Sequence, residues 1–138
     1  GYLVDNQNFL KGTKVTTVGV NQAIVDRDST NTASASSQSI NFLGLTSSYT
    51  SPAATKSILV GGTFSNNTNN SVNLTVEIHD SSSNTAVGLA QKIPVPAGSS
   101  FVISDTGKTL LEANDSVRVY CDSANAIDVS LSVLQGVS

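Results

Sequence analysis

Two side chains in this sequence could act as a nucleophile or an acid–base group: the single histidine, His79, and the single cysteine, Cys121. Either would need a partner, because a catalytic thiol requires a nearby base and an imidazole requires a carboxylate or a metal. His79 falls on the polar side of one alternating stretch, and Cys121 falls in phase with Val117 and Val119 on the apolar side of another. We therefore expect an exposed structural histidine, a buried core cysteine and no enzymatic activity.

The acidic residues offer a weaker case for a metal site. Asp26 and Asp28 are two positions apart, so they would share one face of a strand and could bind Ca²⁺ together. Further carboxylates could come from Asp5, Asp105, Asp115 and Asp122. However, the sequence lacks a calcium-loop pattern, and turn aspartates commonly accept hydrogen bonds from local amides. We expect no metal and no other cofactor.

Composition limits the remaining functions. The chain has 138 residues, which predicts one domain, and only 12% of them are charged. Ser, Thr and Asn together number 49, so hydroxyls and amides must cover much of the surface. The formal net charge of -3 and the scattered basic residues argue against a nucleic-acid partner. The apolar runs are far shorter than the roughly 20 residues needed to span a bilayer, so we expect no membrane partner.

Alternating hydrophobicity predicts strands through most of the chain. The clearest example is residues 72–79, with Val72, Leu74, Val76 and Ile78 on one face. We expect residues 56–65 to pair with residues 72–80 as a hairpin, because the Asn-rich link 66–70 suits a turn. The adjacent Gly61 and Gly62 predict a bulge or a close backbone approach. Further strands are expected at residues 15–20, 23–27, 40–45, 86–93, 100–104, 117–121 and 127–133.

The segments between these strands are expected to be irregular. Residues 28–39 and 47–55 are read as loops, and residues 110–113 as a single helical turn. Residues 1–14 show neither helical nor strand periodicity and are expected to form an N-terminal arm. Its apolar residues would contact a neighbouring subunit or lie across the protein's own sheet; they are Tyr2, Leu3, Val4, Phe9 and Leu10.

About eight strands at roughly ten-residue spacing predict an all-β fold. We expect a single-domain antiparallel β-sandwich over residues 15–138, of jelly-roll kind, preceded by the arm at residues 1–14. In the last strand, alternation predicts a buried face of Ile127, Val129, Leu131 and Val133.

The carboxy-terminal segments resemble a known module. Three runs carry the resemblance: Ile93-Pro94-Val95-Pro96-Ala97-Gly98-Ser99, then Leu110-Leu111-Glu112-Ala113-Asn114-Asp115, and finally Ile127-Asp128-Val129. Together with the stretch from residue 56 to 80, they are similar to a sandwich module of small virion structural proteins of tailed bacteriophages. Asn114 stands where that module usually has glycine, and Asn can adopt the same left-handed turn.

The resemblance implies a viral structural protein, and it brings no catalytic residues. The module occurs in head decoration proteins and in neck and tail components. A compact sandwich with an apolar arm favours a capsid decoration (cement) protein that binds and stabilises the lattice of major capsid protein, with a homotrimer as the favoured assembly. The implied location is the exterior of the virion capsid, after synthesis in the cytoplasm of the host bacterium. A neck or tail subunit is the alternative, and a carbohydrate- or receptor-binding module is a third candidate.

Overall fold

The computed structural model describes residues 2–10, 13–30, 40–103 and 108–137, with Asn41 and Phe42 described by their backbone alone. Within these residues the regular structure consists of strands, and the all-β prediction is confirmed. The strands are β1 (Leu3–Asp5), β2 (Val15–Gly19), β3 (Gln22–Val25), β4 (Asn41–Leu43), β5 (Thr46–Thr50), β6 (Ser57–Asn66), β7 (Val72–Asp80), β8 (Thr85–Val95), β9 (Ser100–Ile103), β10 (Thr109–Leu111), β11 (Ser116–Cys121) and β12 (Ile127–Gln135).

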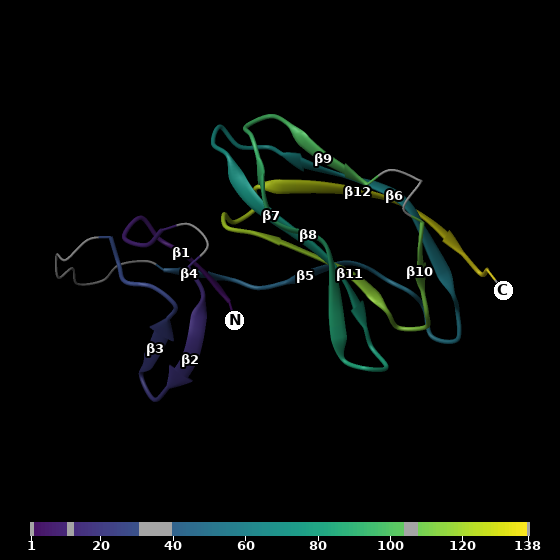
Figure 1. Ribbon diagram of the computed structural model, residues 1–138, viewed down its shortest axis with the longest axis horizontal. Coiled ribbons are helices and arrows are strands. Elements are labelled where there is room, and N and C mark those ends of the chain that lie inside the picture. The colour runs from purple at the N-terminus through teal and green to yellow at the C-terminus, as the bar shows by residue number, and fades with distance from the viewer. Residues whose placement is uncertain (1, 11–12, 31–39, 104–107, 138) are drawn as a thin grey trace.

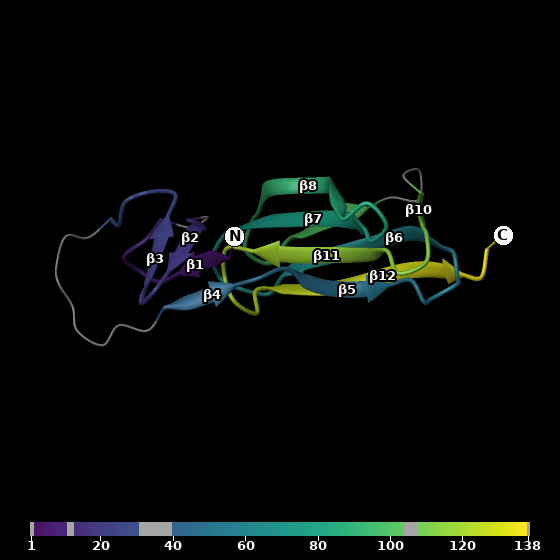
Figure 2. The ribbon, with the colours of Figure 1, turned by 90° about the horizontal axis from the view of Figure 1, so that it is seen from below.

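Two four-stranded antiparallel sheets form the larger part of the molecule. One has the order β5-β11-β7-β8, and the other has the order β10-β6-β12 with β9 also paired to β6. Figure 1 shows them as two layers, with β9, β12 and β6 above β7, β8 and β11. Two further pairs, β1 with β4 and β2 with β3, lie at the opposite end from the C-terminus in Figures 1 and 2, and we call them the N-terminal lobe.

The hydrophobic core lies between the two larger sheets. Phe64 and Leu59 from β6 are fully buried, as are Leu74 and Val76 from β7. The alternation read in β7 and β11 therefore identified the buried faces correctly, including Cys121. In β12 the expected face is half-buried at Ile127, Leu131 and Val133. Val129 is 38% exposed, because β12 is the edge strand of its sheet.

The predicted hairpin between residues 56–65 and 72–80 is wrong. Both strands form, but β6 and β7 belong to opposite sheets, and the segment between them crosses the core. Asn66 holds this crossing: its amide Nδ2 donates to the carbonyl oxygens of Asn70 (2.7 Å) and Val95 (2.9 Å). The apolar face of each strand packs against the sheet that contains the other strand. In a hairpin both strands would lie in one sheet, and these two faces could not cover each other.

Two other local predictions are also wrong, one of them in part. The first half of the expected loop at residues 47–55 belongs to β5, whose Ser- and Thr-rich sequence lacks alternation, while residues 51–55 are irregular as expected. Backbone pairing to β11 makes β5 a strand, and hydroxyl contacts near its end support it, with Tyr49 Oη and Ser51 Oγ each 2.9 Å from Ser57 Oγ. The expected helical turn at residues 110–113 overlaps β10, which pairs with β6.

The predictions for Gly61, Gly62 and Asn114 are confirmed. The β6–β12 register skips a residue beside Gly61, and a Cβ at Gly62 would lie 2.7 Å from Leu131 Cδ2. Asn114 adopts a φ of 69°, the left-handed conformation expected for it from the sequence. The β2–β3 strands turn at Asn21, which also has positive φ (58°). The predicted loop at residues 28–39 lies largely outside the described residues.

The predicted arm is not confirmed. Residues 3–5 pair with β4, and the amide of Val4 donates to the carbonyl of Thr13 (2.8 Å). The first residues therefore fold into the N-terminal lobe together with the β2–β3 hairpin, which was assigned to the sandwich from the sequence. The order of the strands likewise does not confirm the jelly-roll closure.

Candidate functional site

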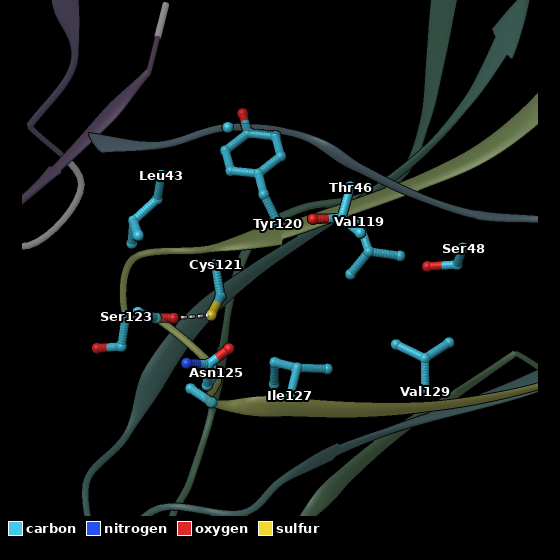
Figure 3. Close-up of a pocket in the computed structure, with 13 residues that line it drawn as sticks. Leu43, Thr46, Ser48, Val119, Tyr120, Cys121, Ser123, Asn125, Ile127 and Val129 are labelled. Atoms are coloured by element: carbon cyan, nitrogen blue, oxygen red, sulfur yellow. Dashed lines mark hydrogen bonds between the residues drawn. The ribbon is translucent and has the colours of Figure 1, made fainter. Parts of the chain in front are cut away.

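A groove of about 380 Å³ runs along one side of the two larger sheets, and we call it the seam groove. It lies between β5 on one sheet and β12 on the other, with β11 beneath (Figure 3). Its lining residues are Leu43, Gly44, Thr46, Ser48, Val119, Tyr120, Cys121, Ser123, Ala124, Asn125, Ala126, Ile127 and Val129.

The seam groove exists because both of its long walls are edge strands. β5 pairs only with β11, and β12 pairs only with β6, so no strand joins the two sheets along this side of the described structure. Hydroxyls of Thr46 and Ser48 lie on one wall, opposite the apolar side chains of Ile127 and Val129 (Figure 3). Unpaired edges and apolar walls suit binding to another polypeptide segment or to an apolar group.

The chemistry available in the seam groove is limited to contact and hydrogen bonding. The lining residues include no histidine, carboxylate, lysine or arginine. Cys121 lines the groove and is 8% exposed, and its thiol donates to the carbonyl oxygen of Ser123 at 2.8 Å. Cys121 therefore behaves as the core residue predicted from the sequence, although its position beside a groove was not foreseen.

The histidine lies away from this groove. His79, near the end of β7, is half-buried rather than exposed, and its Nε2 lies 3.1 Å from the side-chain oxygen of Asn84. This contact links the two ends of the β7–β8 turn, which is a structural role. The neighbouring Asp80 accepts hydrogen bonds from Ser82 and Ser83, and the Ser82 hydroxyl contributes most to lowering its pKa to about 2.

Two of the aspartates considered for a metal site accept hydrogen bonds from backbone amides across the fold. Asp26 accepts from the amide of Lys14 (2.9 Å), which is the main cause of its lowered pKa, with a smaller contribution from Arg27. Asp115 accepts from the amides of Ser81 and Glu112. Among the described residues no three His, Cys, Asp or Glu side chains gather where they could hold a metal. Asp105 lies outside the described residues.

The five residues predicted to contact a partner divide into two groups. Leu3 and Val4 are buried within the chain, at 3% and 4% exposure, and Phe9 is half-buried. Tyr2 and Leu10 remain accessible, at 58% and 56% exposure. Of the predicted contacts, these two side chains are therefore the ones that a partner could reach in this conformation.

A second exposed apolar surface was missed in the sequence. Val18, Val20 and Ile24 at the β2–β3 turn are 78%, 91% and 51% exposed, and we call them the hairpin tip. No charged residue occurs from Val15 to Val25. The hydrophobic pattern did not reveal this surface. It led us to place the two strands in the sandwich, where one face of each strand would be buried. The uncharged run between Lys14 and Asp26 was the available signal.

No described helix is long and apolar enough to cross a membrane. A comparison with models of protein families gives no match, and comparisons with curated proteins and with solved structures give none either.

Proposed function

We propose that this chain is a non-enzymatic structural protein of a tailed-bacteriophage virion, most specifically a decoration protein that binds and stabilises the lattice of major capsid protein. The observation that carries the proposal is the hairpin tip. Val18 and Val20 are 78% and 91% exposed on a lobe that stands away from the core. Large apolar side chains exposed together on a soluble surface typically mark a contact with another protein.

The remainder of the molecule is consistent with this role. The two larger sheets form a body with a continuous core, and the seam groove lacks the side chains that catalysis needs. The similarity of residues 56–137 to virion sandwich modules supplies the assignment to a phage particle, and a jelly-roll closure belongs to that expectation. Three copies around a local three-fold axis of the shell would give the homotrimer, on the capsid exterior.

In this proposal the partner binds a surface of the N-terminal lobe and not the N-terminal arm predicted from the sequence. This surface comprises the hairpin tip together with Tyr2 and Leu10. Each of these side chains would bury apolar area on docking, worth about 25 cal/mol per Å² before the costs of association. Leu3 and Val4 would act indirectly, by packing the lobe that presents the surface.

The test is attachment to expanded phage heads that lack this protein. A Val18→Ser, Val20→Ser double variant should lose attachment while keeping the cooperative unfolding of the parent. A Val87→Ser, Val102→Ser double variant is the matched control, since these valines are 67% and 61% exposed on the larger sheets. Full attachment of the hairpin variant would refute the docking surface, and failure of the parent to bind heads would refute the decoration role.

The number of copies per virion distinguishes a decoration protein from the alternative, a neck or tail subunit. Hundreds of copies per particle support decoration, whereas about a dozen or fewer would place the chain in a ring on the portal axis.

A further inference from the structure

We propose that a small cleft where the N-terminal lobe meets the larger sheets binds a free oxyanion of phosphate or sulfate size. The cleft has a volume of about 190 Å³. Three cationic side chains line it: Lys14, Arg27 and Lys92. We call it the basic cleft. It is separate from the seam groove, although Tyr120 lines both.

The three cations come from distant parts of the chain. Lys14 precedes β2, Arg27 follows β3, and Lys92 lies within β8, in the same sheet as β7 and β11. They are three of only seven lysines and arginines in a chain whose net charge is -3. Like charges held around a small volume repel one another, and a bound anion removes that repulsion.

Lys92, whose side chain lines the cleft, has an unusual backbone conformation and lies in a β-bulge. Lys92 has a φ of 50°, an uncommon conformation for a residue with a side chain. It lies in a bulge of β8, where the β7–β8 register jumps between Leu74 and Val76, and its amide donates to Thr75 Oγ1 at 3.1 Å. Bulges of this kind re-aim side chains and occur often beside binding sites.

Lys14 is held at the cleft by Tyr120. Its ammonium donates to Tyr120 Oη at 3.3 Å and lies 5.7 Å from the centre of the same ring. This contact joins the lobe to β11. The cleft is therefore lined from both parts of the molecule, and an anion bound there would hold the lobe against the larger sheets.

The carboxylates near the cleft offset only part of its positive charge. Asp122 also lines it, but its two oxygens accept from the amide and Nδ2 of Asn73, at 2.9 and 3.0 Å. The two ion pairs among the described residues are Arg27 with Asp26 (3.4 Å) and Lys56 with Glu112, so Asp122 has no direct cationic partner there. Lys14, Arg27 and Lys92 against the carboxylates of Asp122 and Asp26 leave a net charge of +1 at the cleft.

The size of the cleft and its donors select the ligand. Sites for nucleotides and other small-molecule ligands typically have about 300–1,000 Å³, so this cleft suits a single oxyanion group. Guanidinium and ammonium groups are the usual partners of phosphate and sulfate, with hydrogen bonds strengthened by the opposite charges. The Tyr120 hydroxyl and the Asn73 amide are further polar groups close at hand.

The experiment is a titration of the full chain with inorganic phosphate, followed by NMR, against sodium chloride at matched ionic strength. We expect saturable shifts at the basic cleft, with a dissociation constant on the order of 1 mM, which corresponds to about -4 kcal/mol. Phosphate should also raise the melting temperature more than chloride does, because a ligand that binds the folded state stabilises it.

Two charge-neutralising variants test whether phosphate binds at the basic cleft and not elsewhere on the surface. Lys92→Gln should weaken phosphate binding about tenfold, the size expected for one lost charge-assisted hydrogen bond. Lys108→Gln removes the same charge from an exposed residue next to β10, at the opposite end of the molecule from the lobe, and should bind as the parent does. Each variant is first checked for parental unfolding in chloride. Equal effects of phosphate and chloride would overturn the proposal, as would parental affinity in Lys92→Gln or equal losses in both variants.

Discussion

Replacing Asn66 tests whether a single buried amide holds the crossing between the two sheets. Asn66 is 2% exposed and makes four side-chain hydrogen bonds. Nδ2 donates to the carbonyls of Asn70 and Val95, and Oδ1 accepts from the amide and hydroxyl of Thr68. In Asn66→Ala the bond to the Val95 carbonyl is the one lost in a buried setting.

The expected loss of stability can be worked from these contacts. An orphaned buried carbonyl costs about 2 kcal/mol, and the three groups nearer the surface, which can turn to water, cost about 1 kcal/mol together. The total of about 3 kcal/mol is a large share of the 5–15 kcal/mol typical of a folded domain. With a urea m-value of about 2 kcal/mol/M, the unfolding midpoint should fall by roughly 1.5 M at unchanged slope.

Urea unfolding followed by circular dichroism is the assay, and the next residue supplies the control. Asn67 is exposed, and its Nδ2 donates to Asp128 at 3.1 Å on the surface, so Asn67→Ala should cost under about 1 kcal/mol. Asn66→Asp keeps the acceptors but sets a carboxylate against two carbonyls, and it should destabilise more than Asn66→Ala. A loss below about 1 kcal/mol in Asn66→Ala, or one no larger than in Asn67→Ala, would refute the reasoning.

Three further predictions concern the core, a turn and a titration. Phe64→Ala, at a fully buried position packed against Phe101, should cost about 3–5 kcal/mol in urea unfolding; a cost under 1 kcal/mol would show that the core does not depend on this ring. Asn114→Gly should leave stability within a few tenths of a kcal/mol while Asn114→Ala costs about 1 kcal/mol, because the φ of 69° penalises a Cβ; equal effects would contradict this. Since the pKa of Asp80 is lowered from 3.8 to about 2, its stabilising contribution is complete above pH 3.8 and is lost as the pH falls toward 2. Ser82→Ala should move the NMR titration of that carboxyl toward 3.8, and a midpoint still near 2 would exclude the Ser82 hydroxyl as its main cause.

The sequence by itself determined most strands of the two larger sheets and, in β7 and β11, the faces that they bury. Alternation with a period of two is a local property, so it identified the buried sides of β7 and β11, and the place of Cys121 among them. Turn positions were equally local, because Asn and Gly tolerate positive φ without help from distant residues, as at Asn21 and Asn114.

Only the tertiary structure decided which strands are neighbours. Alternation marks an apolar face but not the sheet that covers it, so β6 and β7 were read as a hairpin although they face each other across the core. β5 has no apolar period at all and is a strand because β11 offers it backbone partners. The sequence did not predict the seam groove or the basic cleft, because both depend on which strands and segments lie side by side. The groove needs the edges of β5 and β12, and the cleft needs Lys14, Arg27 and Lys92, which only the folded chain brings together.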